Sequence, residues 1–243
     1  MAFVPDLSQA RRLLCVQPHY DDNDLGAGGT IAALAERGAE VFYVTATDDL
    51  VGVRDDSLSD EQARALLRSE QERAGAEIGV REQFWLDLPD AGDYDYFALR
   101  ARVIEHIRRL RPDFLFTVDP WLPFESHRDH LLVGRAVAEA SFLQQFPRLK
   151  SDPEVDRAYE PYGITGIAFY FTRQPNLTFD ISDARERKRR AVGAYEAQFS
   201  PEELELLQVG LEAKEREWAS REPFSHGEAL LVLSPGQLHV HLG

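Results

Sequence analysis

The sequence predicts an α/β protein, in which a mainly parallel, Rossmann-like sheet forms the middle layer of a three-layer α/β/α sandwich. Three observations predict this fold. Short apolar and β-branched segments alternate with longer segments whose apolar residues recur at helical spacing. Polar motifs directly follow two of the strands, where open parallel sheets bind ligands. The 243 residues suit one large domain over 1–243, because two domains would each be small.

The N-terminal part of the chain begins this alternation. The apolar run 13–17 predicts a buried strand, and the Gly- and Ala-rich segment 25–37 predicts a helix that ends at Gly38. The β-branched and aromatic run 40–47 is typical of a second strand, and the charged segment 59–79 is typical of a long helix. This strand–helix–strand order favours parallel pairing of the two strands.

The same alternation continues along the rest of the chain. Pro112 ends the helical stripe that precedes it, and the polar segment 149–161 indicates a surface loop. The remaining strands are expected at 83–86, 113–118, 164–172, 177–181 and 229–232, and the remaining helices at 99–110, 127–146, 184–198 and 201–220.

Composition argues against several classes of protein. The 42 acidic and 27 basic residues give a net charge of -15, which would repel nucleic-acid phosphates and anionic bilayers. Cys15 is the only cysteine, so an intramolecular disulfide and a thiolate metal cage are excluded, and a reducing cytoplasm fits. We find no signal-peptide pattern, and no apolar run reaches the roughly 20 residues of a membrane span.

The first candidate site follows the first strand and reads PHYDDNDLGAGGT over 18–30. It places His19 close to the carboxylates of Asp21, Asp22 and Asp24. Crowded carboxylates are unfavourable unless a cation lies among them, and a divalent metal would supply that charge. The alternative is a solvated turn in which Asp22 or Asp24 caps the next helix. The adjacent histidine favours the metal.

The second candidate site follows a later strand and reads SHRDH over 126–130. His127 and His130 are three residues apart at the start of a helix, so they lie on about the same face. Ser126 is a plausible N-cap of this helix. Ser126 and Asp129 also have the spacing of a capping box, which is a structural alternative for Asp129. Capping and a role in the site can coexist.

Together the two motifs offer a metal site. His19, Asp22 and His130 make a set of two imidazoles and one carboxylate. Three protein ligands and one open position are typical of catalytic zinc. The same set also suits non-haem iron(II).

With these motifs the chain resembles the LmbE-like (PIG-L) family of zinc-dependent N-acetylglucosaminyl deacetylases. The family signature runs Pro-His-Pro-Asp-Asp-Glu, then Leu-Gly-x-Gly-Gly-Thr, and later His-x-Asp-His. The resemblance implies a homo-oligomer that acts on a small-molecule amino sugar. It also implies a role for each matching residue: His19, Asp22 and His130 bind zinc, Asp21 is the general base, His127 assists the tetrahedral intermediate, and Asp129 orients His127.

Two other functions stay open. One is cleavage of a larger amide, such as that of a sugar or thiol conjugate, with the same metal and base. The other is a protein that binds metal or sugar without turnover. A carboxylate beside the ligands, Asp21, argues against binding alone, because such a site needs no base.

The chain departs from the family pattern at positions outside the metal set, and we expect these changes to alter packing or substrate contacts. In the first motif, Tyr20 replaces a proline and Asn23 replaces a glutamate. After the second strand, Asp48 and Asp49 follow Thr47 where the family often has Thr-x-Gly. Leu67, with Arg68 beside it, stands in place of an arginine, and Glu125 stands in place of a tyrosine. Trp121 and Phe124 precede the second motif and offer either a stacking surface for a sugar ring or local core packing.

Overall fold

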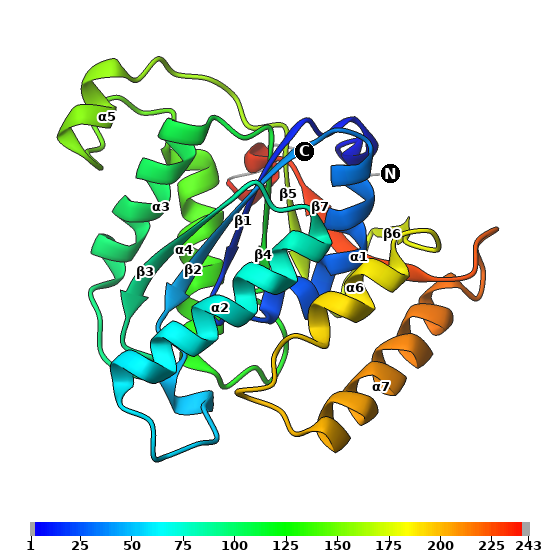
Figure 1. Ribbon diagram of the computed structural model, residues 1–243. Coiled ribbons are helices and arrows are strands. Elements are labelled where there is room, and N and C mark those ends of the chain that lie inside the picture. The colour runs from blue at the N-terminus through cyan, green and yellow to red at the C-terminus, as the bar shows by residue number, and fades with distance from the viewer. Residues whose placement is uncertain (1–2, 240–243) are drawn as a thin grey trace.

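The computed structural model describes residues 3–239 and is built on one sheet with the strand order β3-β2-β1-β4-β5-β7-β6 (Figure 1). β1 pairs in parallel with β2 and β4, and the parallel pairing extends to β3 and β5. β7 runs antiparallel to both β5 and β6. The strands are β1 (Arg12–Gln17), β2 (Glu40–Thr47), β3 (Glu82–Leu88), β4 (Phe114–Val118), β5 (Gly166–Tyr170), β6 (Leu177–Asp180) and β7 (Gly227–Leu233).

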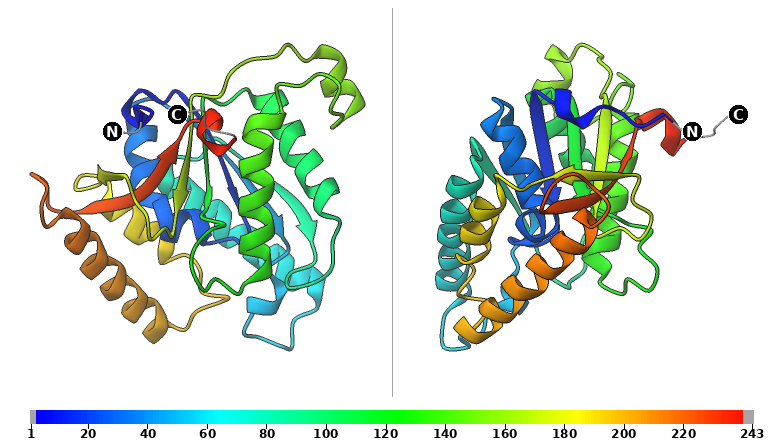
Figure 2. Two further views of the ribbon diagram at one scale, coloured as in Figure 1. Left: turned by 180° about the vertical axis from the view of Figure 1, so that it is seen from behind. Right: turned by 90° about the vertical axis from the view of Figure 1, so that its right-hand side faces the viewer.

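Helices cover both faces of this sheet, so the predicted three-layer sandwich is confirmed. In the right-hand view of Figure 2, α2 and α6 lie on one side of the strands and the green helices on the other. The first layer holds α1 (Asp22–Glu36), α2 (Asp60–Ile78) and α6 (Arg185–Val192), and the second holds α3 (Tyr96–Leu110) and α4 (Arg128–Leu143). α5 (Pro153–Ala158) contacts α3, and α7 (Pro201–Ala219) packs against β7 and β6. Within residues 3–239, no helix has the length and apolar character needed to cross a membrane.

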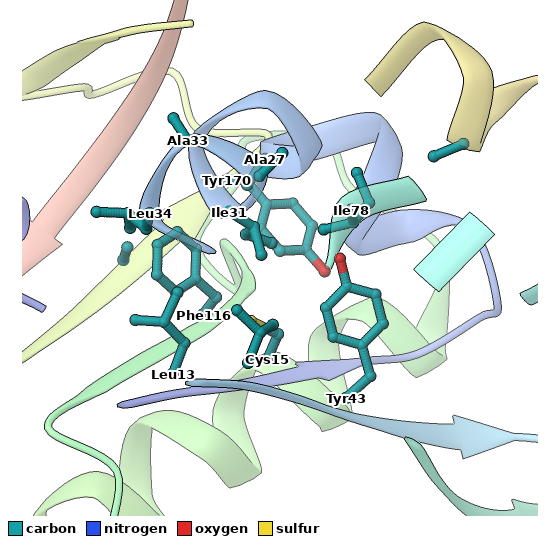
Figure 3. Close-up of a cluster of buried hydrophobic side chains, with 14 of the residues drawn as sticks. Leu13, Cys15, Ala27, Ile31, Ala33, Leu34, Tyr43, Ile78, Phe116 and Tyr170 are labelled. Atoms are coloured by element: carbon teal, nitrogen blue, oxygen red, sulfur yellow. The ribbon is translucent and has the colours of Figure 1, made fainter. Parts of the chain in front are cut away.

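Alternate residues of β1 supply the two cores of the sandwich. Leu13 and Cys15 point toward α1 and pack with Ile31, as Figure 3 shows. Leu14 and Val16 point the other way and pack with α3 and α4. All four side chains are buried, as expected for a parallel strand covered on both faces.

Several helix boundaries differ from the prediction: α3 begins at Tyr96 rather than at residue 99, α4 ends at Leu143 rather than at 146, and α6 ends at Val192 rather than at 198. Two further differences bear on the site. α1 begins at Asp22 rather than at residue 25, so the acidic run is the first turn of the helix and not a solvated turn before it. The N-cap of α4 is His127, not Ser126, and its side chain makes no capping hydrogen bond. Asp129 does not form a capping box either, because both of its oxygens accept hydrogen bonds from another loop.

A short helix, α5, lies inside the segment 149–161 that the sequence predicts as a loop. The side chain of Asp152 accepts hydrogen bonds from the backbone of Glu154 and Val155, and Pro153 occupies the first turn. An Asp N-cap followed by proline is a common start of a helix. The prediction of a loop was wrong because it relied on the polar composition of the segment.

A buried ion cluster ties α1 to the C-terminal part of the sheet. Lys188 Nζ lies 2.7 Å from Glu228 Oε1 and 3.1 Å from Glu215 Oε1. The Glu228 carboxylate also accepts hydrogen bonds from the backbone N–H groups of Gly29 and Thr30, at 3.0 and 2.7 Å. All three charged side chains are buried, so each depends on its partners for compensation.

We expect Glu228→Ala to lower the free energy of unfolding by about 3–5 kcal/mol, because it leaves a buried ammonium short of a partner. Denaturant unfolding measures this loss. Glu222→Ala, at an exposed acidic position, is the matched control. Adding Lys188→Met to Glu228→Ala should recover part of the loss, since the unpaired charge is removed. Equal unfolding midpoints for Glu228→Ala and the control would contradict the role of the cluster.

Candidate active site

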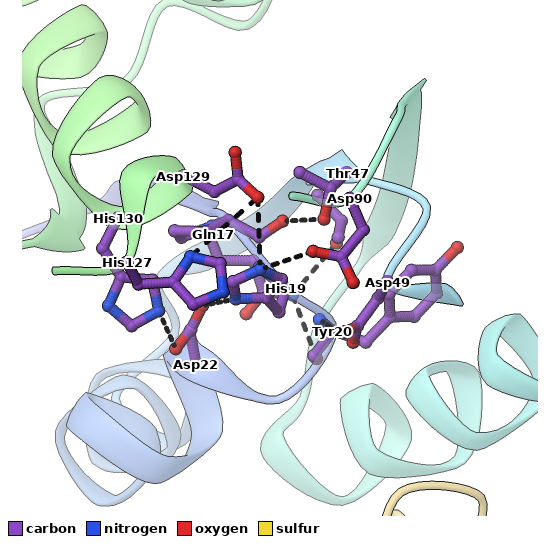
Figure 4. Close-up of polar contacts among 12 residues, drawn as sticks. Gln17, His19, Tyr20, Asp22, Thr47, Asp49, Asp90, His127, Asp129 and His130 are labelled. Carbon is purple, nitrogen blue, oxygen red and sulfur yellow. Dashed lines mark hydrogen bonds and ion pairs between the residues drawn. The ribbon is translucent and has the colours of Figure 1, made fainter. Parts of the chain in front are cut away.

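The candidate site lies at the carboxyl edge of the parallel strands. His19 follows β1, Asp49 follows β2, Asp90 follows β3 and His127 follows β4, and Figure 4 shows these side chains converging. In the sheet, β2 lies on one side of β1 and β4 lies on the other side, so the chain reverses the direction in which it adds strands. The site therefore sits at the switch point of the sheet, where such folds bind ligands.

The loop after β1 is held by buried hydrogen bonds. Gln17 uses both ends of its amide: Oε1 accepts from Asn23 N at 2.8 Å and Nε2 donates to Tyr20 O at 3.1 Å. Asn23 Oδ1 accepts from the Tyr170 hydroxyl at 3.0 Å. Tyr20 and Asn23 are both fully buried. These two departures from the family pattern therefore serve packing.

The predicted metal residues lie together. Asp22 Oδ2 is 3.3 Å from His19 Nδ1, and Asp22 Oδ1 is 3.5 Å from His130 Nε2. The ring centroids of His19 and His130 are 5.3 Å apart. His127 joins them, since its ring centroid lies 4.5 Å from that of His19 and 5.0 Å from that of His130. Two compact groups of metal-binding donors occur within residues 3–239: His19, His127 and His130, and His19, Asp90, His127 and Asp129.

The charge balance of the site calls for a cation. His19 Nε2 and Asp90 Oδ1 are buried, lie 3.3 Å apart, and make no hydrogen bond. Burial lowers the pKa of the His19 ring, but the carboxylates of Asp129, Asp22 and Asp90 outweigh burial and raise this pKa above its ordinary value. The surroundings thus favour positive charge at this point. Imidazole nitrogens and carboxylate oxygens are donors that fit a divalent metal.

Asp21 has the environment of an acid–base group. It is the N-cap of α1 but makes no capping hydrogen bond with its side chain. The residue is buried, and it lines a cavity of about 310 Å³ together with His127 and His130. Burial, followed by the charges of Asp22 and Asp49, raises the pKa of Asp21 well above its ordinary value. A carboxyl with a raised pKa can exchange a proton near neutral pH.

Asp129 is fixed by the loop after β3. Its Oδ1 accepts from the Tyr94 hydroxyl at 2.7 Å and its Oδ2 accepts from Ala91 N at 2.9 Å. Burial raises the pKa of Asp129, but the nearby His19 ring and the hydrogen bonds from Tyr94 and Ala91 lower it to about 2. Asp129 Oδ2 lies 3.9 Å from His127 Nδ1, which is too far for a hydrogen bond. The pair is close, and Asp129 faces the ring that it was predicted to orient.

His127 is the most exposed of the three histidines. Its side chain is 42% exposed, against 18% for His130 and 11% for His19. Burial lowers the pKa of His127, and the neighbouring His19 and His130 lower it further. The ring is placed to meet a molecule that enters the cavity.

Sequence reasoning missed Asp90. Its Oδ2 accepts from Val51 N at 3.1 Å, and its Oδ1 faces His19. No motif surrounds this residue, so its position directly beyond the carboxyl end of β3 was the only available signal.

Glu125 was noted only as a replacement for a tyrosine. Its Oε2 lies 3.2 Å from His130 Nδ1, and its Oε1 accepts from His127 N at 2.7 Å. One carboxylate therefore contacts the ring of one histidine and the backbone of another. A carboxylate on the far nitrogen of a ligating histidine is a common way to fix its tautomer and orientation.

The two acidic residues after β2 have different surroundings. Asp48 pairs with Arg64 at 2.9 Å and accepts from Asp90 N at 3.1 Å, so it holds the loop after β3. Asp49 lines the cavity and has a φ of 55°, the left-handed region that favours glycine. Burial raises the pKa of Asp49 to about 7.

Other predicted contacts lie away from the cavity. Trp121 packs edge-on against Phe169, with ring centroids 5.2 Å apart, which is the local packing alternative. Phe124 is 98% exposed and is not among the cavity residues. Leu67 is buried in the core, and Arg68 pairs with Asp87.

A Rossmann-like sheet with a His–Asp metal site and a buried carboxyl at its carboxyl edge defines a metal-dependent amidohydrolase. The chain belongs to the PIG-L family, since residues 14–141 match the family described as GlcNAc-PI de-N-acetylase. The resemblance drawn from the two motifs is thereby confirmed, and the chain is a hydrolase of carbon–nitrogen amide bonds that uses a divalent metal.

Several relatives are named deacetylases. The chain is 36% identical over 200 residues to the diacetylchitobiose deacetylase of Thermococcus kodakarensis, covering 82% of this chain and 74% of that one. It is 30% identical over 180 residues to the 1D-myo-inositol 2-acetamido-2-deoxy-alpha-D-glucopyranoside deacetylase of Rhodococcus jostii, covering 61% and 60%. The structure of the N,N'-diacetylchitobiose deacetylase from Pyrococcus horikoshii matches with a TM-score of 0.89 and 32% identity, covering 97% of this chain and 88% of that one.

Proposed function

We propose that this chain is a zinc-dependent deacetylase that removes an N-acetyl group from a small molecule containing N-acetylglucosamine. The buried Asp21 carboxyl beside His19, Asp22 and His130 carries the proposal, because it joins a base to a metal site in one cavity. The relatives that act on N-acetylglucosamine-containing molecules support the substrate class.

His19, Asp22 and His130 would hold the metal. Two imidazoles and one carboxylate leave a position open, which favours zinc, and the set also accepts iron(II). Bound zinc supplies Lewis acidity toward the amide carbonyl and lowers the pKa of a water ligand. Measuring the metal content of the active protein separates zinc from iron.

The chain's own residues move the protons. Asp21 takes the proton of the attacking water, a task that its raised pKa suits. His127 is exposed to the cavity and acts in its protonated form: it stabilises the negative oxygen of the tetrahedral intermediate or passes its ring proton to the departing amine nitrogen. Asp129, fixed by Tyr94 and Ala91, keeps a negative charge beside His127.

The size of the cavity bears on the larger-amide alternative. About 310 Å³ is at the small end of ligand sites and suits one acetylated sugar ring at the metal. This observation favours a small amino sugar. Release of acetate from a panel of N-acetylglucosamine derivatives, by metal-free protein and again after zinc is restored, tests the function.

The proposal has three further parts. The chain forms one catalytic domain over 1–243, and its single cysteine suits a reducing, cytoplasmic compartment. A homo-oligomer is expected from the family resemblance. Leu206 and Val209, which are exposed on one face of α7, are apolar surface that such an assembly could cover. Light scattering on the purified chain measures the oligomeric state.

We expect Asp21→Asn to lower kcat by at least about 100-fold, because the amide cannot accept the proton of the attacking water. Zinc content should stay unchanged, since the predicted ligands remain. Steady-state acetate release and metal analysis measure the two quantities. Asp183→Asn, at an exposed acidic position, is the matched control. Full activity in Asp21→Asn would show that another group is the base.

We expect Glu125→Gln to weaken zinc binding by about 10–100-fold, because an amide holds the His130 ring less firmly than a carboxylate does. Competition with a chelator of known affinity measures this change without any substrate. Glu160→Gln, on an exposed loop, is the control. Unchanged zinc affinity in Glu125→Gln would mean that the contact between Glu125 and His130 does not support the metal site.

A further inference from the structure

Carboxylates dominate the charged lining of the catalytic cavity, which also holds the rings of three histidines. Four carboxylates line it, those of Asp21, Asp22, Asp49 and Asp90. Among the described residues that line it, there is no lysine or arginine. A divalent metal would neutralise only part of this charge. The cavity therefore offers an incoming molecule a negative potential, which the net charge of -15 reinforces.

Several basic residues on the loops and helices around the site form ion pairs with carboxylates. Arg64 pairs with Asp48 at 2.9 Å, and Arg128 lies 3.4 Å from Asp93. Arg68 and Arg54 likewise pair with Asp87 and Glu203, and the buried Lys188 pairs with Glu215 and Glu228. The exposed pairs among them are weak, but none of these basic side chains lines the cavity, so a phosphate or carboxylate bound inside it would remain uncompensated.

One of the cavity carboxylates has an unusual backbone. Asp49 has a φ of 55°, in the left-handed region that suits glycine better than a residue with a side chain. Its Oδ2 accepts from Tyr20 N at 3.1 Å and from Gln198 Nε2 at 2.8 Å. Its Oδ1 lies beside Gly52, another residue that lines the cavity. A Cβ atom added to Gly52 would lie 3.3 Å from Asp49 Oδ1.

A second carboxylate reinforces this end of the cavity. The Asp90 side chain is only 5% exposed, and its Oδ1 makes no hydrogen bond. His19 Nε2 lies 3.3 Å from this oxygen, so the buried carboxylate depends on nearby positive charge to offset its lost hydration. Asp49 and Asp90 both line the cavity, so a positively charged group between them would gain two favourable interactions.

We propose that this cavity selects its substrate by charge: it takes N-acetylated amino sugars whose attached group is cationic or neutral, rejects anionic conjugates, and owes part of this selectivity to Asp49. The inference rests on the proposed deacetylase function. A free amino group on the attached sugar or alkyl chain is the cation that the cavity best accommodates. We assign Asp49 a role in the choice of substrate rather than in the cleavage of the amide, because its hydrogen bonds go to Tyr20 and Gln198.

Three probes of nearly equal size test the selectivity: the 2-aminoethyl, 2-hydroxyethyl and carboxymethyl glycosides of N-acetylglucosamine. Acetate release is measured, because the aminoethyl probe already contains a primary amine. The assays are run on the zinc-loaded protein at low ionic strength and pH 8. Asp49 is ionised there, since burial raises its pKa only to about 7.

We expect kcat/KM to fall in the order aminoethyl, hydroxyethyl, carboxymethyl, with about a 100-fold range that narrows as salt screens the charges. Asp49→Asn keeps the acceptor oxygen for Tyr20 N and should reduce the ratio of aminoethyl to carboxymethyl kcat/KM about tenfold. Glu72→Gln removes one exposed carboxylate outside the cavity and should leave the ratio as in the unmodified protein. This control separates local charge from net charge.

The outcomes distinguish the two levels of the proposal. Equal kcat/KM for the three probes would overturn charge selection and leave the deacetylase function standing. A clear order that persists in Asp49→Asn would overturn the role of Asp49. Acetate release from none of the probes by the zinc-loaded protein would overturn the proposed function, and charge selection with it.

Discussion

Repulsion between carboxylates at the carboxyl edge of β1 is the constraint on which the rest of the site depends. Asp21 and Asp22 are adjacent and buried, and the same histidine is approached by Asp90 from the loop after β3 and by Asp129 from the first turn of α4. Such a group is stable only with a cation among its members. The fold keeps the carboxylates close by fixing their backbone through buried amides such as Gln17, and the metal supplies the charge that makes this closeness tolerable.

Much of the fold and part of the site could be predicted from sequence, because those features are local. The run 40–47 became β2 with the same bounds, since β-branched residues and flanking breaks specify a buried strand directly. The gathering of His19, Asp22 and His130 followed from two motifs that each come after a strand. Parallel strands bring their carboxyl ends to one edge, so sequence position alone placed them near one another.

What could not be predicted depends on contacts between distant segments. Asp129 looked like a capping residue, but Ala91 and Tyr94, 38 and 35 positions away, use its oxygens. Asp90 carries no motif, and it joins the site only because β3 pairs with β2. Tyr20 and Asn23 were expected to alter either packing or substrate contacts, and their burial under neighbouring elements decides for packing. The residues next to a polar side chain in the sequence do not show which distant group will form a hydrogen bond with it in the fold.

The cluster of Lys188, Glu215 and Glu228 also bears on the order in which the protein matures during synthesis. Glu228 accepts from Gly29 N across 199 positions of the chain. The helix that begins with the metal motif thus leaves the ribosome long before the residue that anchors it. N-terminal segments generally fold first, yet these contacts of α1 can form only after β7 has been translated. The helix that carries the metal motif therefore gains its last buried anchor from a segment that is made much later.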